Sequence, residues 1–191
     1  KLSCTIGMLR PGETRTLTMI AMLPADLIYL AGAPFTIDAT GNVTDRAGND
    51  AVPTNNTSMA TVKAVAVADL AISSFEPPNP PRQMLAGEPV VIELASILGS
   101  GGPSSPMDTL LTLRSMTDNG ANVTPTLLTT TQAALRQDEA RTVFDHAILL
   151  CKEPGNHKFR FEHRIAPDRA PDSDPAAGNN TAVHDFAIEC L

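Results

Sequence analysis

Three cysteines have the most easily stated chemistry in this chain, and they stand far apart in the sequence. Cys4, Cys151 and Cys190 form no CxxC pair, so their spacing argues against a zinc or iron–sulfur site. Two interpretations remain for the later pair, a disulfide or two buried free thiols. The choice depends on whether the fold brings Cys151 and Cys190 together.

Carboxylate and amide side chains gather in two turn-rich loops, where they are candidate ligands of a hard cation such as Ca²⁺. In the second loop the candidate calcium ligands are Asp168, Asp172 and Asp174, with Asn179 and Asn180 close by. A parallel set in the first loop comprises Asp45, Asn49, Asp50, Asn55 and Asn56. The EF-hand pattern is absent, and solvated Asx turns are the alternative, because Asp and Asn are ordinary turn residues. Calcium is the one cofactor that the sequence suggests.

Four histidines, at positions 146, 157, 163 and 184, are the remaining candidates for metal binding or general-base catalysis. His157 and His163 share one face of an alternating stretch, and His184 lies on a similar face later in the chain. We interpret them as core-edge or surface histidines. The sequence contains no Gly-x-Ser-x-Gly elbow, P-loop, dinucleotide fingerprint or His-Glu-x-x-His. No catalytic residue is predicted, and we expect that the protein is not an enzyme.

Sequons for N-glycosylation occur at several positions along the chain. The candidate glycosylation sites are Asn42, Asn55, Asn56, Asn122 and Asn179. Loops rich in Thr and Asn produce sequons by chance, but their number here is typical of an exposed, glycosylated surface protein.

Composition limits the classes of protein to which this chain can belong. With 191 residues and 42% hydrophobic side chains, it can bury the core of one large domain or two small ones. The net charge of −7 and the lack of a Lys/Arg run argue against binding to nucleic acid or to an anionic membrane surface. The longest apolar stretch, from Met19 to Ala33, is interrupted by Pro24, Asp26 and Gly32, so no direct membrane insertion is expected.

Alternation with a period of two is the dominant pattern and predicts half-buried β-strands. The clearest example is the stretch 158–165, where Phe159, Phe161, His163 and Ile165 share the predicted core face. Two further stretches repeat the pattern. Their predicted inward residues are Ala182, His184, Phe186, Ile188 and Cys190 in the last stretch, and Val90, Ile92 and Leu94 in the stretch 87–95. Turn-rich segments separate these strands, which together predict an all-β sandwich.

The predicted strands decide between the two interpretations of the later cysteines. Cys151 ends one predicted strand and Cys190 ends the last one, and in a sandwich those two strands run in the same direction. We therefore predict a Cys151–Cys190 disulfide, which would stabilise the fold by about 3–4 kcal/mol. Cys4 is then unpaired within the chain and is expected to bond to upstream residues or to another molecule. A disulfide indicates an oxidising compartment.

The stretch from Thr131 to Arg141 lacks clear alternation, and we interpret it as a short helix or turn that crosses between the sheets. An internal repeat sets the domain boundary. Residues 50–62 and 174–183 each contain an acidic, Pro-containing loop, then Asn-Asn-Thr, then an alternating strand. We therefore predict two units, 1–65 and 66–191. The linker between them is short, which favours a stiff rod over freely jointed domains.

These repeats resemble a known family. Residues Leu9 to Thr14, Leu17 to Met19 and the Asn55-Asn56-Thr57 triplet resemble the second half of the conserved-repeat Ig-like domain of bacterial and archaeal surface proteins. Several later segments resemble the first half of the next copy. They are Ala68 to Ile72, Pro78 to Pro80, Ala86 to Pro89 and Gly101 to Ser104. The end of that copy is similar to the related CARDB-type adhesion module, whereas Met116 to Arg141 departs from the pattern.

The resemblance implies tandem immunoglobulin-like antiparallel β-sandwiches, of which the first is incomplete. Residues 1 to about 64 would supply its last three or four strands. A half-sandwich exposes an apolar face and unpaired strand edges. Its missing strands would come from upstream sequence, which we favour, or from a neighbouring chain by strand addition.

The function that follows is a non-enzymatic structural or spacer component of an extracellular or cell-surface fibre or assembly. The expected partners are other copies of the chain or neighbouring surface-protein subunits. Two alternatives remain. One is an adhesion or ligand-binding module that uses the end loops Leu98–Pro106 or Ala166–Asn180, and the other is an accessory subunit that coats a larger extracellular complex.

Overall fold

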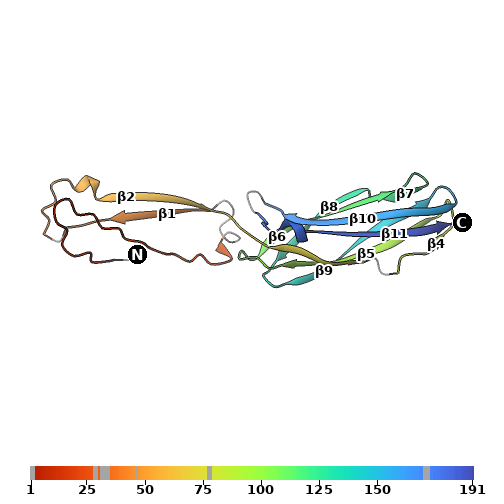
Figure 1. Cartoon of the computed structure of the whole chain (residues 1–191), viewed down its shortest axis with the longest axis horizontal. Helices are drawn as coiled ribbons and strands as arrows, with labels where there is room; N and C mark the ends of the chain where they lie inside the picture. Colours follow the sequence, from red (N-terminus) through yellow and green to blue (C-terminus); the bar gives the residue numbers. More distant parts are fainter. Residues whose placement is uncertain (1–2, 28–29, 31–34, 46, 77–78, 170–172) are drawn as a thin grey trace.

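The alternating stretches fold as strands throughout the computed structural model (Figure 1), which describes all residues except 1–2, 28–29, 31–34, 46, 77–78 and 170–172. Two sheets face each other in an all-β, antiparallel sandwich, as predicted, and a separate hairpin extends from one end of it. The hairpin strands are β1 (Phe35–Asn42) and β2 (Thr57–Ala64).

The sandwich contains one sheet of five strands and one of four. The five-stranded sheet has the order β4-β11-β10-β6-β8, and the four-stranded sheet the order β3-β5-β9-β7. The bounds of the first sheet are β4 (Gln83–Met84), β11 (Thr181–Cys190), β10 (Gly155–Pro167), β6 (Met107–Thr117) and β8 (Leu127–Leu135). Those of the second are β3 (Leu70–Glu76), β5 (Pro89–Ser100), β9 (Ala140–Cys151) and β7 (Ala121–Thr124). Two short 3₁₀ helices, η1 (Pro53–Asn55) and η2 (Ala177–Asn179), precede β2 and β11.

The core lies between the two sheets and includes residues that the period-two pattern assigned to it. Phe159, Phe161, His163 and Ile165 are all buried along β10. On β5, Ile92 and Leu94 are buried as well. Phe186 of β11 stacks against Phe159 and Phe161, with ring centroids 5.8 and 5.7 Å apart. The predicted core faces of these three strands are therefore confirmed.

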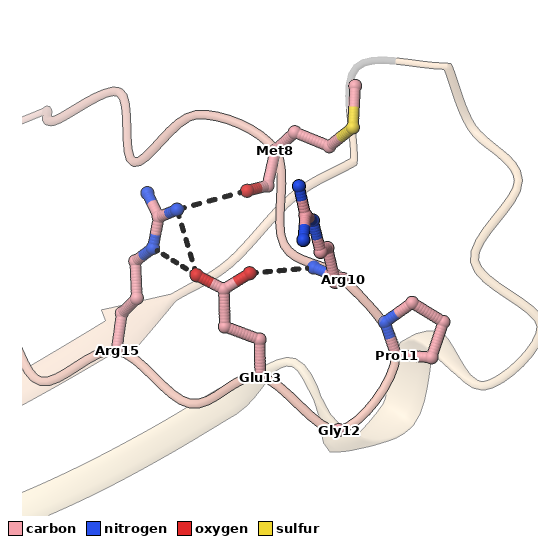
Figure 2. Close-up of a pocket in the computed structure, with 6 residues that line it drawn as sticks. All are labelled: Met8, Arg10, Pro11, Gly12, Glu13 and Arg15. Carbon is pink, nitrogen blue, oxygen red and sulfur yellow. Dashed lines mark hydrogen bonds and ion pairs between the residues drawn. The ribbon is translucent and has the colours of Figure 1, made fainter.

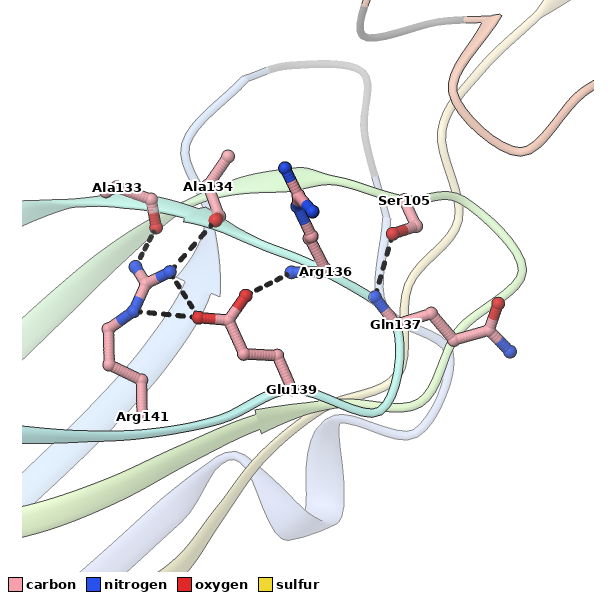
Figure 3. A network of polar contacts seen from close by, with 7 residues as sticks. All are labelled: Ser105, Ala133, Ala134, Arg136, Gln137, Glu139 and Arg141. Atoms are coloured by element: carbon pink, nitrogen blue, oxygen red, sulfur yellow. Dashed lines mark hydrogen bonds and ion pairs between the residues drawn. The ribbon is translucent and has the colours of Figure 1, made fainter.

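The helix suggested for Thr131–Arg141 is wrong, although the crossing between sheets occurs there. β8 ends in the five-stranded sheet, and β9 begins in the four-stranded sheet after a four-residue turn (Figure 3). In this turn Asp138 has a positive φ of 60°, which ends any helix. Glu139 accepts hydrogen bonds from the Arg136 amide and from Arg141, whose guanidinium also donates to the carbonyls of Ala133 and Ala134.

Three or four strands were expected in the first 64 residues, and the described part of that segment contains fewer. Within the described residues of that segment, the only regular strands are β1 and β2, which pair antiparallel from Phe35↔Ala64 to Asn42↔Thr57. Residues 3–23 run without strand pairing. A tight turn stands out in them, where Glu13 accepts from the Arg10 amide at 2.9 Å and from Arg15 (Figure 2). These two donors hold the pKa of Glu13 below its usual range.

Candidate functional site

The segment that joins the hairpin to the sandwich is bonded to the sandwich on both sides. The Ala68 amide donates to the Ser173 carbonyl at 3.0 Å, and the Ser173 amide donates to the Ala66 carbonyl at 3.1 Å. Val67 and Ser104 form two hydrogen bonds. The Val67 amide donates to the Ser104 Oγ at 3.0 Å, and the Ser104 amide donates to the Val67 carbonyl at 3.0 Å. Residues 66–68 therefore form part of the sandwich and do not act as a free linker.

Apolar packing reinforces this junction. Ala66 and Ala68 are buried in a cluster with the inward side chains at that end of the sandwich, and Phe35 and Ala64 at the base of the hairpin pack against the same cluster. The inward residues are Leu70, Leu98, Met107, Leu111, Leu135 and Ile165. The loop after β5 passes so close that a Cβ atom on Gly102 would lie 2.3 Å from the Ala68 Cα. Glycine is required at position 102 for this close approach.

The acidic loop that we predicted as a calcium site lies at this junction. Asp174 accepts three hydrogen bonds, from the Leu70 amide at 2.8 Å, the Ala176 amide at 2.8 Å and the Asn180 side chain at 2.9 Å. Asn179 donates to Asp69 at 2.9 Å. N–H donors thus occupy both carboxylate oxygens of Asp174, which fastens β3 to the loop before β11.

A metal at this loop is not supported by the geometry of the described residues. Among them, no group of three or more His, Cys, Asp or Glu side chains is placed to hold a metal ion. Asp168 is exposed, and Asp172 lies outside the described residues. In the first loop, Asp45 and Asp50 accept bonds from nearby amides, the Asx turns that we gave as the alternative.

The opposite end of the sandwich is closed by the predicted disulfide. Cys151 at the end of β9 and Cys190 at the end of β11 are bonded, with Cα atoms 6.0 Å apart, and both are buried. The bond links the four-stranded sheet to the five-stranded sheet. Cys4 is exposed and has no disulfide partner within the part of the chain that the structure describes.

His157 bridges two loops at this same end of the sandwich through Asp118 and Glu153, and we call these contacts the His157 clasp. Its Nδ1 lies 2.7 Å from an Asp118 carboxylate oxygen, and its Nε2 lies 2.9 Å from the Glu153 carbonyl. Both partners are acceptors, so both ring nitrogens must donate, which makes the ring an imidazolium. The Asp118 carboxylate raises the pKa of His157, and the Glu153 carbonyl adds to the effect. Asp118 also accepts from the Lys158 amide at 2.9 Å, which is the main reason that its own pKa is lowered.

A buried polar triad joins the sheets midway between the two ends. His163 of β10 contacts Ser96 of β5 through Nδ1 at 2.9 Å and Asp145 of β9 through Nε2 at 2.9 Å. Serine hydrolases use the same three types of side chain. Here the Ser96 residue is 0% exposed, so a substrate cannot reach its hydroxyl in this conformation. The triad instead connects the inner faces of opposite sheets.

Three of the predicted glycosylation sites, Asn42, Asn55 and Asn56, lie at the tip of the hairpin, and the other two, Asn122 and Asn179, belong to the sandwich. Asn122 is exposed on β7, and Asn42, Asn55 and Asn179 are exposed near strand ends. Asn56 lies beside the 3₁₀ turn η1, where its side chain donates to Asp50 at 2.7 Å. The structure does not gather them on one face, and glycosylation stays a prediction.

No protein-family model matches this chain, and no curated protein is similar to it. Solved structures with a similar fold do exist. One is the CARDB domain of a Pyrococcus furiosus protein in complex with di-metal ions. It is 14% identical to this chain with a TM-score of 0.41, and the match covers 65% of this chain and 89% of that one. Two others have a lower identity. One is a chain in the complex of zinc 2-glycoprotein and prolactin-inducible protein from human seminal plasma, which is 10% identical with a TM-score of 0.38, and the match covers 63% of this chain and 96% of that one. The other is a conjugative transposon lipoprotein from Bacteroides eggerthii, which is 9% identical with a TM-score of 0.28, and the match covers 63% of this chain and 95% of that one.

Sequence reasoning did not find the His157 clasp, the buried triad or the bonds that fix the junction. The partners are separated by 39 residues in the clasp, by 67 and 18 in the triad, and by 104 between Leu70 and Asp174. One signal was present, a histidine on the core face of a strand. A buried histidine needs polar partners on the facing sheet, but the sequence does not identify them.

Proposed function

We propose that this chain is a non-enzymatic structural or spacer component of an extracellular or cell-surface assembly. The observation that carries the proposal is the junction, where residues 66–68 are hydrogen bonded on both sides. A spacer must keep its units at fixed positions under load. A linker that is packed into the core of one unit keeps the two units at fixed positions without a large interface between them.

The end loops support a spacer role more than a ligand-binding role. The two loops that we considered for ligand recognition, Leu98–Pro106 and Ala166–Asn180, supply Ser104, Ser173 and Asp174 to the junction. These three residues are thus already hydrogen bonded within the chain. An adhesion module would leave such loops free to meet a partner.

An oxidising environment is supported by the disulfide between Cys151 and Cys190. No helix in the described part of the chain is long and apolar enough to cross a membrane. On the strength of the disulfide, we propose that the protein lies outside the cell or on its surface, with copies of itself or neighbouring surface subunits as partners.

The proposal is tested first by the intact mass of protein taken from its natural source and alkylated without reduction. Alkylation of Cys4 alone, with Cys151 and Cys190 oxidised, is the expected result, and mass added at sequons would report glycans. Alkylation of all three cysteines would contradict an extracellular role, since the later pair would then be reduced in the cell.

Force spectroscopy tests the mechanical part of the proposal. When the chain is pulled between the hairpin tip and the C-terminus, the hairpin should stay attached to the sandwich until the sandwich itself unfolds. Asp174→Ala should lower the force at which they separate, whereas Asp168→Ala in the same loop should not. Separation at low force in the unaltered chain would contradict a load-bearing junction.

A further inference from the structure

The outer faces of the two sheets differ sharply in chemistry. The five-stranded sheet presents charged side chains to solvent, as an outer face normally does. They include Arg114, Lys158, Arg160, Arg164, Asp185 and Glu189. On the four-stranded sheet, by contrast, large apolar side chains stand exposed on β5 and β9. Val91 is 63% exposed, Phe144 is 58% exposed and Ile148 is 44% exposed.

These apolar residues lie along one strip of the sheet, which we call the β5–β9 face. Their inward neighbours Ile92, Ala147 and Leu149 are buried, so the exposed side chains all point away from the core. The antiparallel register places Val91 opposite Ile148. It also places Ala95 opposite Phe144, four residues further along β5. An exposed apolar strip centred on an aromatic ring is typical of an interaction surface.

One polar pair interrupts the strip at its middle. Glu93 and His146 are opposite each other in the register between the Val91–Ile148 and Ala95–Phe144 pairs, and their side chains approach to 3.8 Å. Among the described side chains of β5, β7 and β9 that point outward, these are the only ionisable ones. The face therefore carries an acid on one strand and a base on the other.

This arrangement is complementary to itself under a two-fold axis that runs along the strands between β5 and β9. Rotation by 180° about that axis lays β5 of one copy over β9 of the other at the same height. Val91 then meets Ile148 of the second copy, and the small Ala95 meets the large Phe144. Glu93 meets His146, so a carboxylate faces an imidazole at both central positions.

We propose that the β5–β9 face is a docking surface for a second copy of this chain, packed face to face about that two-fold axis. This proposal rests on the proposed function. It names the surface through which copies of the chain would associate side by side. Isologous contacts of this kind are the commonest in homo-oligomers. Aligned packing of two sheets places them about 10 Å apart, at a distance where such side chains interdigitate.

The size of the face predicts a weak dimer. Eleven paired residues of β5 and β9 extend about 36 Å, and with one further strand the face covers about 500 Å² per copy. Two such faces bury about 1,000 Å² in total, which is near the lower limit of a specific interface. Association at the high local concentration of a surface assembly is therefore expected, with mostly monomers in dilute solution.

Sedimentation equilibrium of the full chain tests the proposal, with Cys4→Ser in every sample so that the exposed thiol cannot couple copies. The weight-average mass should rise from monomer towards dimer between about 10 µM and about 1 mM. Val91→Lys should weaken association at least about tenfold. Val183→Lys is the matched control, because Val183 is an exposed strand valine on the outer face of the five-stranded sheet. It should leave association unchanged.

Charge exchange tests the two-fold geometry itself. Glu93→Lys places a lysine opposite His146 of the second copy and should weaken the dimer. His146→Glu should also weaken it, because it places two carboxylates opposite each other, and the double variant should restore association, because a lysine then faces a glutamate. A chain that stays monomeric at every concentration would overturn the proposal, as would equal effects of Val91→Lys and Val183→Lys or a double variant without rescue. None of these results would bear on the state of the cysteines or the strength of the junction, which test the proposed function.

Discussion

At the scale of single residues, the histidines of this chain act as connectors between strands. His157 bridges two loops, and His163 bridges two sheets. The two acceptors that face His157 favour its doubly protonated form, in which both ring nitrogens donate.

The His157 clasp makes stability depend on pH. Its pKa in the folded chain is raised above the ordinary value of 6.5. The clasp therefore contributes fully below pH 6.5, and its contribution is lost as pH rises through the folded pKa. The pKa of Asp118 is lowered from 3.8, so its contribution is lost only as pH falls through that lower value. We expect urea titrations to show a free energy of unfolding that declines above neutral pH.

Two variants isolate this effect. His157→Gln should flatten the decline, because glutamine does not titrate. Gly120→Ala should do the same, since a Cβ there would lie 1.9 Å from the His157 ring. Gly178→Ala is the control, with nothing within 4 Å of its Cβ. An unchanged pH profile in both test variants would show that the clasp is not the source of the decline.

The buried triad should be costly to break. His163→Ala leaves a cavity in the core and deprives Asp145 of its partner, and we expect a loss of about 3–5 kcal/mol in the free energy of unfolding. Ser96→Ala removes one hydrogen bond and should cost about 1 kcal/mol. His146→Ala, at an exposed position, should change the value by less than about 0.5 kcal/mol. A loss below about 1 kcal/mol for His163→Ala would mean that the triad contributes little.

At the scale of strands and loops, the molecule is fastened at both ends of the sandwich. The disulfide and the His157 clasp close one end, and the junction closes the other. These fastenings all connect segments that the strand pairing alone leaves separate.

Removing the disulfide should weaken the whole sandwich. The bond closes a loop between residues 39 positions apart, and the double variant Cys151→Ala/Cys190→Ala should lower the free energy of unfolding by about 3–4 kcal/mol. Cys4→Ser should leave it unchanged, since Cys4 is exposed. Guanidinium unfolding of the three proteins measures the difference. Equal midpoints would contradict a stabilising role of the bond.

Asp174 should protect one amide in particular. Asp174→Ala leaves the Leu70 amide without its acceptor, so exchange of that amide with deuterium should accelerate, and stability should fall by about 1–3 kcal/mol. Asp168→Ala provides the comparison, because Asp168 bonds to the Asp108 carbonyl through its backbone amide, which the substitution keeps. Slow exchange of Leu70 in the Asp174 variant would show that another group protects it.

Alternation along β5, β10 and β11 was enough to predict their inward faces, because a strand places every second side chain on the same side. It failed where the backbone leaves that geometry. Gln132 to Leu135 have helical propensities, but pairing with β6 and the left-handed Asp138 make this segment a strand and a turn. The junction could not be predicted either, since Asp174 resembles an ordinary turn residue until its distant partner Leu70 is known.

At the scale of the whole molecule, the hairpin and the sandwich lie end to end along the long axis (Figure 1). Phe35 and Ala64 at the base of the hairpin share a cluster with the sandwich core, and residues 66–68 are bonded into it. The hairpin and the sandwich should therefore move as one body.

Residual dipolar couplings of the backbone amides, measured on the full chain in a dilute aligned medium, test whether they do. Amides of β1 and β2 should fit the same alignment tensor, with the same magnitude, as amides of β5, β9 and β10. A separate tensor for the hairpin, or couplings scaled towards zero there, would contradict it.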